Sequence, residues 1–363
     1  MGLKSNSVHV AVMPGDGIGV EVTEAAMGVL GKLVRRHGLG LSTESLQAGA
    51  FAYQETGTAM SEPVFERARQ ADAILLGAMG WPGIRYPDGT EIAPQLDLRF
   101  RLGLYAGVRP IRAIPGVKLP LADARAAQID MVILRESTEG LFAARGRGEI
   151  IEDREARDTM VITRATTERL SRFAFRLAER RAARLGRKQT VTLVDKANVF
   201  TGFAFMRKVF LEVAQTFPEV PAATHYIDAM ALDLVRRPWD FDVLPTENMF
   251  GDILSDLGAG LIGGMGYAPS ADIGDDHAVF QPSHGTGPDI AGKGIANPTA
   301  MILSAALMLD WLGAEGAGQA WSDAAAELEA AVDAAFRGGL RSAEFGGSGT
   351  AEVARAIAAE IPG

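Results

Sequence analysis

Short apolar runs that alternate with amphipathic stretches are the feature that most constrains how this chain can fold. Runs at residues 8–13, 73–76, 131–134 and 190–194 have the length and composition of buried strands, and a turn or a polar residue follows each. Residues 166–185 instead carry apolar residues at helical spacing. Strands that alternate with helices predict an α/β architecture with parallel strands.

Size and charge narrow the class of protein. A chain of 363 residues is too long for one ordinary core and predicts two domains or lobes. Its net charge of −9 argues against a nucleic-acid partner. No run approaches the roughly 18 apolar residues of a membrane span, so we also expect no membrane partner.

The chain contains no cysteine. This excludes a disulfide scaffold, a thiolate nucleophile and a cysteine-ligated zinc site, and it fits a cytoplasmic location. Residues 1–7 lack the apolar segment of a secretory signal, and Asn6 breaks the myristoylation pattern.

Two carboxylates lie four residues apart where a helix is expected. Residues 247–256 follow an apolar run, and they contain Asp252 and Asp256. Helical spacing places their Cβ atoms roughly 5–6 Å apart on one face, so both can bind one hard cation such as Mg²⁺ or Mn²⁺. Alternatively, paired aspartates at a helix start serve as caps, which is the interpretation that these ten residues alone favour.

Other charged residues follow expected strands and helices. Arg99, Arg109 and Arg135 are candidate binders of carboxylates. Lys196 follows the strand at 190–194 and is a general acid or base if its pKa is depressed, whereas Asp228 follows a short strand at 225–227. Taken singly, each is more typical of a solvated surface charge.

Glycine-rich segments and an unusually polar stretch complete the pattern. Residues 14–21 form a turn between a strand and a helix, which is a weak phosphate-binding signal. Residues 281–298 predict an ordered loop that could wrap an adenosine. Residues 145–163 are polar and predict a projecting arm or loop. Three alanine-rich helices are expected near residues 299–313, 322–336 and 350–360.

Six motifs in order carry a family resemblance, which spans about residues 8–312. They are Gly15-Asp16-Gly17-Ile18-Gly19, Leu104-Tyr105-Ala106-x-x-Arg109-Pro110, Arg135-Glu136-x-Thr138, Asp195-Lys196-Ala197-Asn198, Asn248-x-Phe250-Gly251-Asp252-Ile253-Leu254-Ser255-Asp256 and His284-Gly285-x-x-Pro288-Asp289-Ile290-Ala291-Gly292-Lys293. Together they resemble the β-decarboxylating dehydrogenases of (R)-malate derivatives. This family includes isopropylmalate, isocitrate, homoisocitrate and tartrate/D-malate dehydrogenases.

The resemblance implies a two-lobed, isopropylmalate-dehydrogenase-like α/β fold that is not a Rossmann fold. Residues 1–104 and 263–363 would form a large, NAD-binding lobe. Residues 105–262 would form a small lobe for dimerisation and for the metal and substrate. The arm near residues 145–163 would build a homodimer with shared active sites, or a higher oligomer.

The resemblance also implies roles for individual residues. Arg99, Arg109 and Arg135 would hold the malate carboxylates. Mg²⁺ or Mn²⁺ would be bound by Asp252 and Asp256 together with Asp228 of the partner subunit, and Lys196 of the partner subunit would be the general base. The cofactor NAD, favoured over NADP because of Asp289 and Ile290, would contact Asn248, His284, Gly285, Asp289, Ile290 and Asn297.

One position departs from the family pattern. Phe142 stands where the family usually has a proton-donating tyrosine, and a phenyl ring cannot donate a proton. Either water, Lys196 or another group donates, or the chain is a catalytically weak or regulatory subunit. The complete set of arginines and metal carboxylates favours an active enzyme. A sugar- or nucleotide-binding protein without chemistry would require the aspartate pair and Lys196 to be incidental.

The expected substrate is a 3-substituted (R)-malate that undergoes oxidative decarboxylation. Residues 92–96 match neither the family's isopropyl-binding pattern nor its isocitrate-binding pattern. Gln95 makes this part of the pocket polar. The sequence therefore predicts a small or polar group at C3, as in tartrate or D-malate, and leaves isopropylmalate open.

Overall fold

The computed structural model describes residues 7–363, which divide into two compact units. Unit 1 holds the described chain up to Leu102, together with Ile114–Leu119 and Ile262–Gly363, and unit 2 holds Gly103–Ala113 and Pro120–Leu261. Residues 1–6 lie outside the described residues, so the expectation that the N-terminus carries no signal or lipid anchor stays a prediction.

Unit 1 contains five strands in the order β2-β1-β3-β12-β11. β1 pairs in parallel with β2 and β3, β12 pairs in parallel with β3, and β11 and β12 are antiparallel. The strands are β1 (Ser7–Gly15), β2 (Gly40–Ser45), β3 (Ala73–Ala78), β11 (Pro269–Ile273) and β12 (Ala278–Pro282). Every residue of β3 and β11 is buried, as expected for strands covered on both faces.

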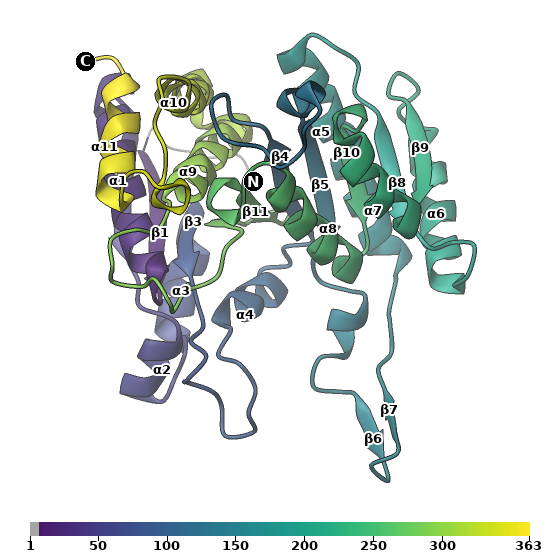
Figure 1. The fold of residues 1–363 in the computed structure, drawn as a ribbon. Helices are drawn as coiled ribbons and strands as arrows, with labels where there is room; N and C mark the ends of the chain where they lie inside the picture. Colours follow the sequence, from purple (N-terminus) through teal and green to yellow (C-terminus); the bar gives the residue numbers. More distant parts are fainter. Residues whose placement is uncertain (1–6) are drawn as a thin grey trace. The chain divides into compact units, whose positions relative to one another are not determined.

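Helices cover the strands of unit 1 (Figure 1). They are α1 (Ile18–His37), α2 (Ala50–Thr56), α3 (Glu62–Gln70), α4 (Pro94–Arg101), α9 (Thr299–Leu312), α10 (Gln319–Arg337) and α11 (Thr350–Glu360). α1 and α9 pack on the strands, and α10 and α11 pack on those helices. One face of α1, formed by Val22, Ala26, Val29 and Leu33, is buried, and Gly38 caps the end of the helix.

Unit 2 contains a second set of five strands, in the order β4-β5-β10-β8-β9. The strands are β4 (Ala106–Arg112), β5 (Asp130–Glu136), β8 (Val191–Asp195), β9 (Ala222–Tyr226) and β10 (Val243–Thr246). β4 and β5 are antiparallel, whereas β5, β10, β8 and β9 run parallel. Both units therefore confirm the α/β class with mostly parallel strands, to which the structure adds two antiparallel pairs.

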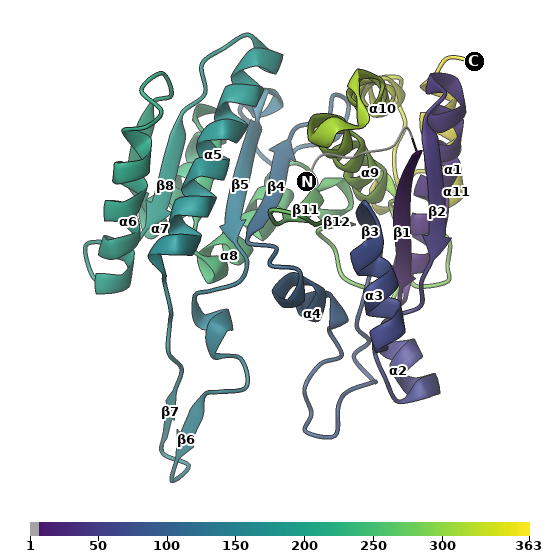
Figure 2. The same cartoon turned by 180° about the vertical axis from the view of Figure 1, so that it is seen from behind.

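The helices of unit 2 lie on both faces of its strands. They are α5 (Arg164–Leu185), α6 (Thr201–Ala214), α7 (Ile227–Arg236) and α8 (Asn248–Leu261). The opposite views of Figure 1 and Figure 2 show α7 and α8 on one face and α5 and α6 on the other. α8 thereby runs from the end of β10 across β5, which bears Arg135.

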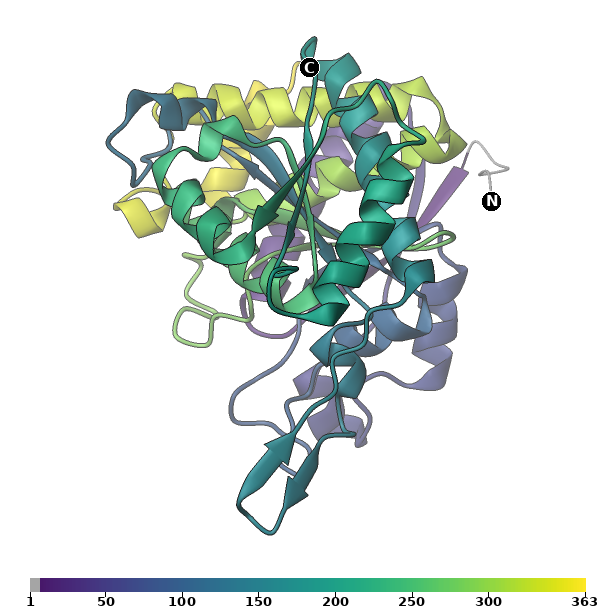
Figure 3. The same ribbon diagram turned by 90° about the vertical axis from the view of Figure 1, so that its right-hand side faces the viewer.

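The predicted projection of residues 145–163 is a β-hairpin. Its strands β6 (Glu149–Ile151) and β7 (Glu155–Arg157) are antiparallel, and they extend away from the rest of unit 2 in Figure 3. At the base, Gly140 bridges to Val161, and the Glu139 carboxylate accepts hydrogen bonds from the Thr163 amide and hydroxyl. The base of the arm is therefore fixed to the start of α5.

Several local expectations need correction. Asp228 lies in the first turn of α7 rather than at a strand end, because β9 ends at Tyr226. Contrary to expectation, the segment Thr299–Ala317 is long and apolar enough for a membrane span, but 56% of its apolar window is buried inside the protein, as in a core helix.

Candidate active site

The parallel strands of unit 2 end at one edge of their sheet. The register pairs Arg135 of β5 and Val194 of β8 with the same residue of β10, Thr246. Further along, Asp195 of β8 pairs with Tyr226 of β9. The edge at the carboxyl ends of parallel strands is where α/β proteins usually bind ligands. The residues that follow these ends include Lys196, Asp228, Asp252 and Asp256.

The start of α8 is capped by a buried glutamate. Glu247 is 2% exposed, and its Oε2 accepts hydrogen bonds from the backbone amides of Met249 (3.1 Å) and Phe250 (3.3 Å). Burial raises the pKa of Glu247, against the effect of these amides. The first turn contains no aspartate. The interpretation of Asp252 and Asp256 as caps is therefore wrong, and both side chains are available for another role.

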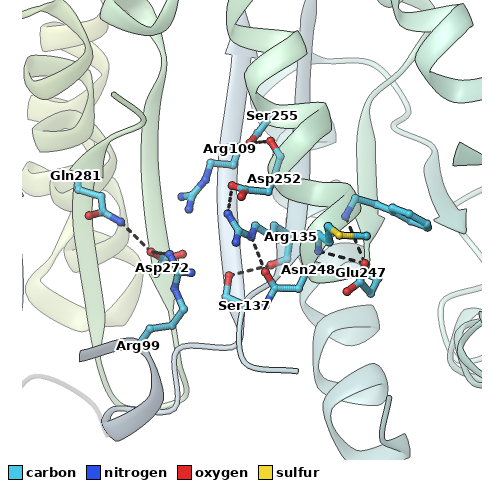
Figure 4. Close-up of polar contacts among 12 residues, drawn as sticks. Arg99, Arg109, Arg135, Ser137, Glu247, Asn248, Asp252, Ser255, Asp272 and Gln281 are labelled. Atoms are coloured by element: carbon cyan, nitrogen blue, oxygen red, sulfur yellow. Dashed lines mark hydrogen bonds and ion pairs between the residues drawn. The ribbon is translucent and has the colours of Figure 1, made fainter. Parts of the chain in front are cut away.

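Arg135 is held against α8 from the end of β5 (Figure 4). Its Nε donates to Asn248 Oδ1 at 2.9 Å, and its Nη1 forms an ion pair with Asp252. Gly251 permits this approach, because a Cβ there would lie 2.7 Å from the Arg135 Cβ. Arg135 is buried, but the Asp252 side chain is 51% exposed. The Arg135 guanidinium is thus fixed by Asn248, and it also faces the accessible carboxylate of Asp252.

Asp256 lies one helical turn beyond Asp252. Burial, and next the negative charge of Asp252, raise the pKa of Asp256, while Arg135 and Arg109 oppose the shift. A carboxylate pair that resists full ionisation is stabilised by a divalent cation, and two carboxylates form a donor set suited to Mg²⁺ or Mn²⁺. The residues present therefore fit a metal at this position.

The third predicted metal ligand, Asp228, lies elsewhere in unit 2. Among residues 7–363, no group of three or more acidic or histidine side chains could hold a metal ion. Asp228 Oδ1 instead accepts a 2.6 Å hydrogen bond from Lys196 Nζ, and this bond lowers the pKa of the Asp228 carboxyl. One chain thus contains two separate clusters, Lys196 with Asp228 and Asp252 with Asp256.

Phe142 lies beside the arginine of this region. It belongs to a short 3₁₀ turn, Leu141–Ala144, and its ring centre is 5.2 Å from the Arg135 guanidinium carbon. A guanidinium over an aromatic face gains a cation–π interaction. Phe142 therefore supports the position of Arg135, although it has no proton to donate.

The third predicted arginine, Arg99, belongs to unit 1. Its Nη2 donates to Asp272 Oδ2 at 3.0 Å, and Gln281 Nε2 donates to the same oxygen at 2.9 Å (Figure 4). Both charged side chains are almost fully buried, at 6% and 3% exposure. Arg99 Nε and Gln95 Oε1 are buried without a partner, and these residues lie one turn apart on α4. α4 thus presents an unused donor and an unused acceptor.

The two glycine-rich segments pack against each other in unit 1. Ile18 N donates to the Thr286 carbonyl at 2.8 Å, and any side chain at Gly17 would overlap that carbonyl. His284 Nε2 is buried without a partner, and burial lowers the pKa of His284. Asn297 is bonded to Thr299 and Glu344. The remaining predicted cofactor residues of this loop are Gly285, Asp289 and Ile290, of which Asp289 is exposed.

A comparison with known protein families decides the assignment. The model of the family described as isocitrate/isopropylmalate dehydrogenase matches residues 9–359. The chain belongs to this family. The resemblance inferred from the six motifs is thereby confirmed.

Individual members of the isocitrate/isopropylmalate dehydrogenase family match over nearly their whole length. The 3-isopropylmalate/3-methylmalate dehydrogenase of Methanocaldococcus jannaschii is 41% identical, over 97% of this chain and 98% of the relative. The 3-isopropylmalate dehydrogenase of Thermobifida fusca is also 41% identical, over 94% and 96%. The crystal structure of isocitrate dehydrogenase from Methylococcus capsulatus superimposes with a TM-score of 0.83 at 36% identity, covering 98% and 99% of the two chains.

Membership of the isocitrate/isopropylmalate dehydrogenase family establishes the class of reaction. The chain is a decarboxylating dehydrogenase, and therefore an oxidoreductase. Dehydrogenases of this family generally use NAD and a divalent metal, and members are typically homodimers that act on small hydroxy acids. The identity of the substrate and the role of each residue in this chain remain proposals.

Three residues of this family member were missed by sequence reasoning. Glu247 was given no role, because its capping of the Met249 amide depends on the turn before α8. Asp272 had a usable signal, since it is the one charged residue of the short strand β11. Arg207 pairs with the buried Asp195, but the sequence carries no signal for this pair. Arg207 stands next to Lys208 on α6, and nothing in the sequence distinguishes the two.

Proposed function

We propose that this protein catalyses the NAD-dependent and divalent-metal-dependent oxidative decarboxylation of a 3-substituted (R)-malate. The observation that carries the proposal is the cluster at α8, where two arginines, Arg109 and Arg135, act on a pair of carboxylates, Asp252 and Asp256. Guanidinium groups suit substrate carboxylates, and paired aspartates suit a hard cation. The dehydrogenase names of the relatives support the same reaction class.

Each group has a defined task in this proposal. Arg109 and Arg135 hold carboxylates of the substrate, and Asp252 and Asp256 hold the cation. A bound NAD would supply the hydride acceptor, and a bound divalent cation would supply a Lewis acid for the loss of carbon dioxide. Lys196 takes the proton of the substrate hydroxyl.

We assign Lys196 and Asp228 to the site of a second copy of the chain. Within one chain they form their own pair, and Asp228 joins no cluster of three possible ligands among the described residues. Exposed apolar side chains lie on the helices next to them, namely Leu232 and Val235 on α7 and Met249 and Ile253 on α8. Burial of such a face in a homodimer removes it from water. The β6–β7 arm, with the exposed Ile150, would add to this interface.

NAD would bind at the loop that follows β12. An exposed acidic residue such as Asp289 suits ribose hydroxyls and disfavours the extra phosphate of NADP. His284, Gly285, Ile290 and Asn297 would line the adenosine part, and the buried, unpartnered Nε2 of His284 is free to meet it. Asn248 is fully buried and bonded to Arg135, so it would act on the cofactor only indirectly.

The substrate would carry a polar or small group at C3. The buried Oε1 of Gln95 and the buried Nε of Arg99 both lack partners, and unpaired buried polar atoms are costly unless a ligand satisfies them. A hydroxyl group can donate to the first and accept from the second. Tartrate meets this requirement better than isopropylmalate does.

A substrate panel tests the reaction and its specificity. D-malate, tartrate, isopropylmalate and isocitrate would be supplied with NAD and Mn²⁺, and NADH absorbance would be followed, with EDTA as the control. We expect metal-dependent turnover and a preference for tartrate or D-malate. Gln95→Leu should shift the preference towards isopropylmalate by roughly 10-fold, the order expected for the loss of one hydrogen bond. Preference for isopropylmalate by the unmodified protein would contradict the specificity proposal.

Phe142 supports a second candidate function, a catalytically weak or regulatory ligand-binding subunit. The ring packs on Arg135 and provides no proton at the position where the family usually has tyrosine. In this case the protein would bind a malate derivative and Mn²⁺ in calorimetry but would not produce NADH. The same panel therefore separates the two candidates.

A further inference from the structure

The strands that deliver Lys196 and Asp228 end side by side. β8 and β9 are parallel neighbours, and their last residues, Asp195 and Tyr226, are directly paired. Lys196 follows the first end, and Asp228 follows the second by two residues in the opening turn of α7. The separation of the ammonium and carboxylate groups therefore depends on how these two ends are held together.

One arginine contacts both strand ends. Arg207 of α6 donates from Nε to Asp195 Oδ2 at 2.8 Å and from Nη2 to Asp195 Oδ1 at 2.7 Å, which is a bidentate pair. Its guanidinium carbon lies 4.9 Å from the centre of the Tyr226 ring. A planar guanidinium can make a fork with a carboxylate and stack on an aromatic ring, which a lysine cannot do in the same way.

Asp195 transmits this contact to the turn that carries Lys196. The Asp195 side chain is fully buried, and besides Arg207 it accepts a 2.8 Å hydrogen bond from the backbone amide of Ala197. The backbone on both sides of Lys196 is thus anchored to one carboxylate. Lys196 Nζ then reaches Asp228 at 2.6 Å, although the Asp228 side chain is 68% exposed. An exposed ion pair has little stability of its own, so its geometry is imposed by the groups beneath it.

We propose that Arg207 is a positioning residue that clamps the ends of β8 and β9 and so holds Lys196 and Asp228 together as one unit. The pairing itself rests on the geometry of a single chain. Its importance for turnover rests on the proposed function, in which this unit completes the site of a second copy. Arg207 touches no reacting atom in this scheme and acts only through Asp195 and Tyr226.

Lysine labelling tests the clamp without turnover. Full-length Arg207→Ala, Arg207→Lys and Lys208→Ala variants would be treated with isotope-labelled acetic anhydride in EDTA, and acetylation of Lys196 would be followed by peptide mass spectrometry. Lys208→Ala is the matched control substitution, because Lys208 is exposed on the same helix. In both Arg207 variants we expect Lys196 to react about two- to fivefold faster, the range for loss of an exposed ion pair. Arg207→Lys keeps a charge beside Asp195 if the alanine variant fails to fold.

Kinetics then tests the consequence for catalysis. With the substrate that the panel identifies, Arg207→Ala should lower kcat roughly 10- to 100-fold, as expected for displaced catalytic groups, and leave KM nearly unchanged. Added guanidinium ion should restore part of this loss, whereas Lys208→Ala should behave like the unmodified protein. Unchanged Lys196 labelling in both folded Arg207 variants would overturn the clamp. Absence of turnover in the unmodified protein would instead contradict the proposed function and leave the labelling result valid.

Discussion

Two arginine sites in this protein look alike in sequence and differ in structure. Arg99 in unit 1 and Arg135 in unit 2 are both buried, and each pairs with an aspartate. The partner of Arg99, Asp272, has a side chain that is 3% exposed, whereas the partner of Arg135, Asp252, is 51% exposed. The same type of ion pair, arginine with aspartate, is therefore buried in unit 1 and accessible to solvent in unit 2.

The difference indicates which pair a ligand can exchange. In the proposed function, a metal ion would reach the exposed Asp252 carboxylate from solvent, and Arg135 would then be able to bind a substrate carboxylate. Asp272 has no such access, and it is fixed further by Gln281. Charge at Arg99 is thus largely compensated inside the protein, and its buried Nε has no partner. We infer that Arg135 can exchange its aspartate partner for an anionic ligand, whereas Arg99 keeps its partner Asp272 when a ligand binds.

The largest expected effect comes from removing the exchangeable partner. Asp252→Asn should lower kcat/KM at least about 100-fold, the order lost when a group that stabilises developing charge is removed. Initial rates with Mn²⁺ would measure it. Asp123→Asn, which removes an exposed aspartate paired with Arg125 in the same unit, is the matched control and should be nearly neutral. Full activity of Asp252→Asn would sink the metal assignment.

Breaking the sealed pair should mainly affect stability. Arg99→Ala leaves Asp272 buried without its cation, and such a loss costs about 3–5 kcal/mol. Arg135→Ala should cost less, because water can solvate Asp252. Urea unfolding of the two variants would compare them, and Arg99→Ala combined with Asp272→Asn should recover much of the loss. Equal losses in the free energy of unfolding for Arg99→Ala and Arg135→Ala would contradict the difference in burial of the two ion pairs.

As the pH falls, metal binding should weaken at a higher pH than it would at a site made of ordinary carboxylates. Burial and the charge of Asp252 raise the pKa of Asp256, so a proton competes with the cation as the pH falls towards this raised value. Mn²⁺ at a hundredfold excess over its Kd should stabilise the protein by about 2.7 kcal/mol at neutral pH, and thermal shifts should show this gain decline in acid. Asp256→Asn should abolish the gain. A gain that stays constant down to the usual aspartate pKa would contradict the shift.

The smallest effect is expected at the ring beside Arg135. Phe142→Tyr keeps the aromatic face over the guanidinium, so we expect a change in kcat far below the 10²- to 10⁴-fold of an added general acid. Stopped-flow measurement of NADH formation would record it. A large acceleration would instead show that the missing tyrosine limits turnover, and would favour the interpretation as a weakened family member.

Much of the architecture was readable from the sequence. Apolar runs followed by polar residues predicted β1, β3, β5 and β8, and helical periodicity predicted α1, α5 and the three C-terminal helices, since both patterns follow from local geometry and burial. β2, β4, β11 and β12 were missed. β2 is largely exposed, so it has no continuous apolar run, and the charged Asp272 interrupts that of β11.

The sequence alone also determined the family and the types of residue in the candidate site, because six motifs in order specify chemistry through residue identity and spacing. Only the tertiary structure decided which side chains meet. It placed Asp272 under Arg99, Glu247 at the cap of α8, and Arg207 between two strand ends. The contacts of Arg99 with Asp272 and of Arg207 with Asp195 join residues on different elements. Local pattern cannot specify them, because burial and pairing are set by how the strands and helices pack.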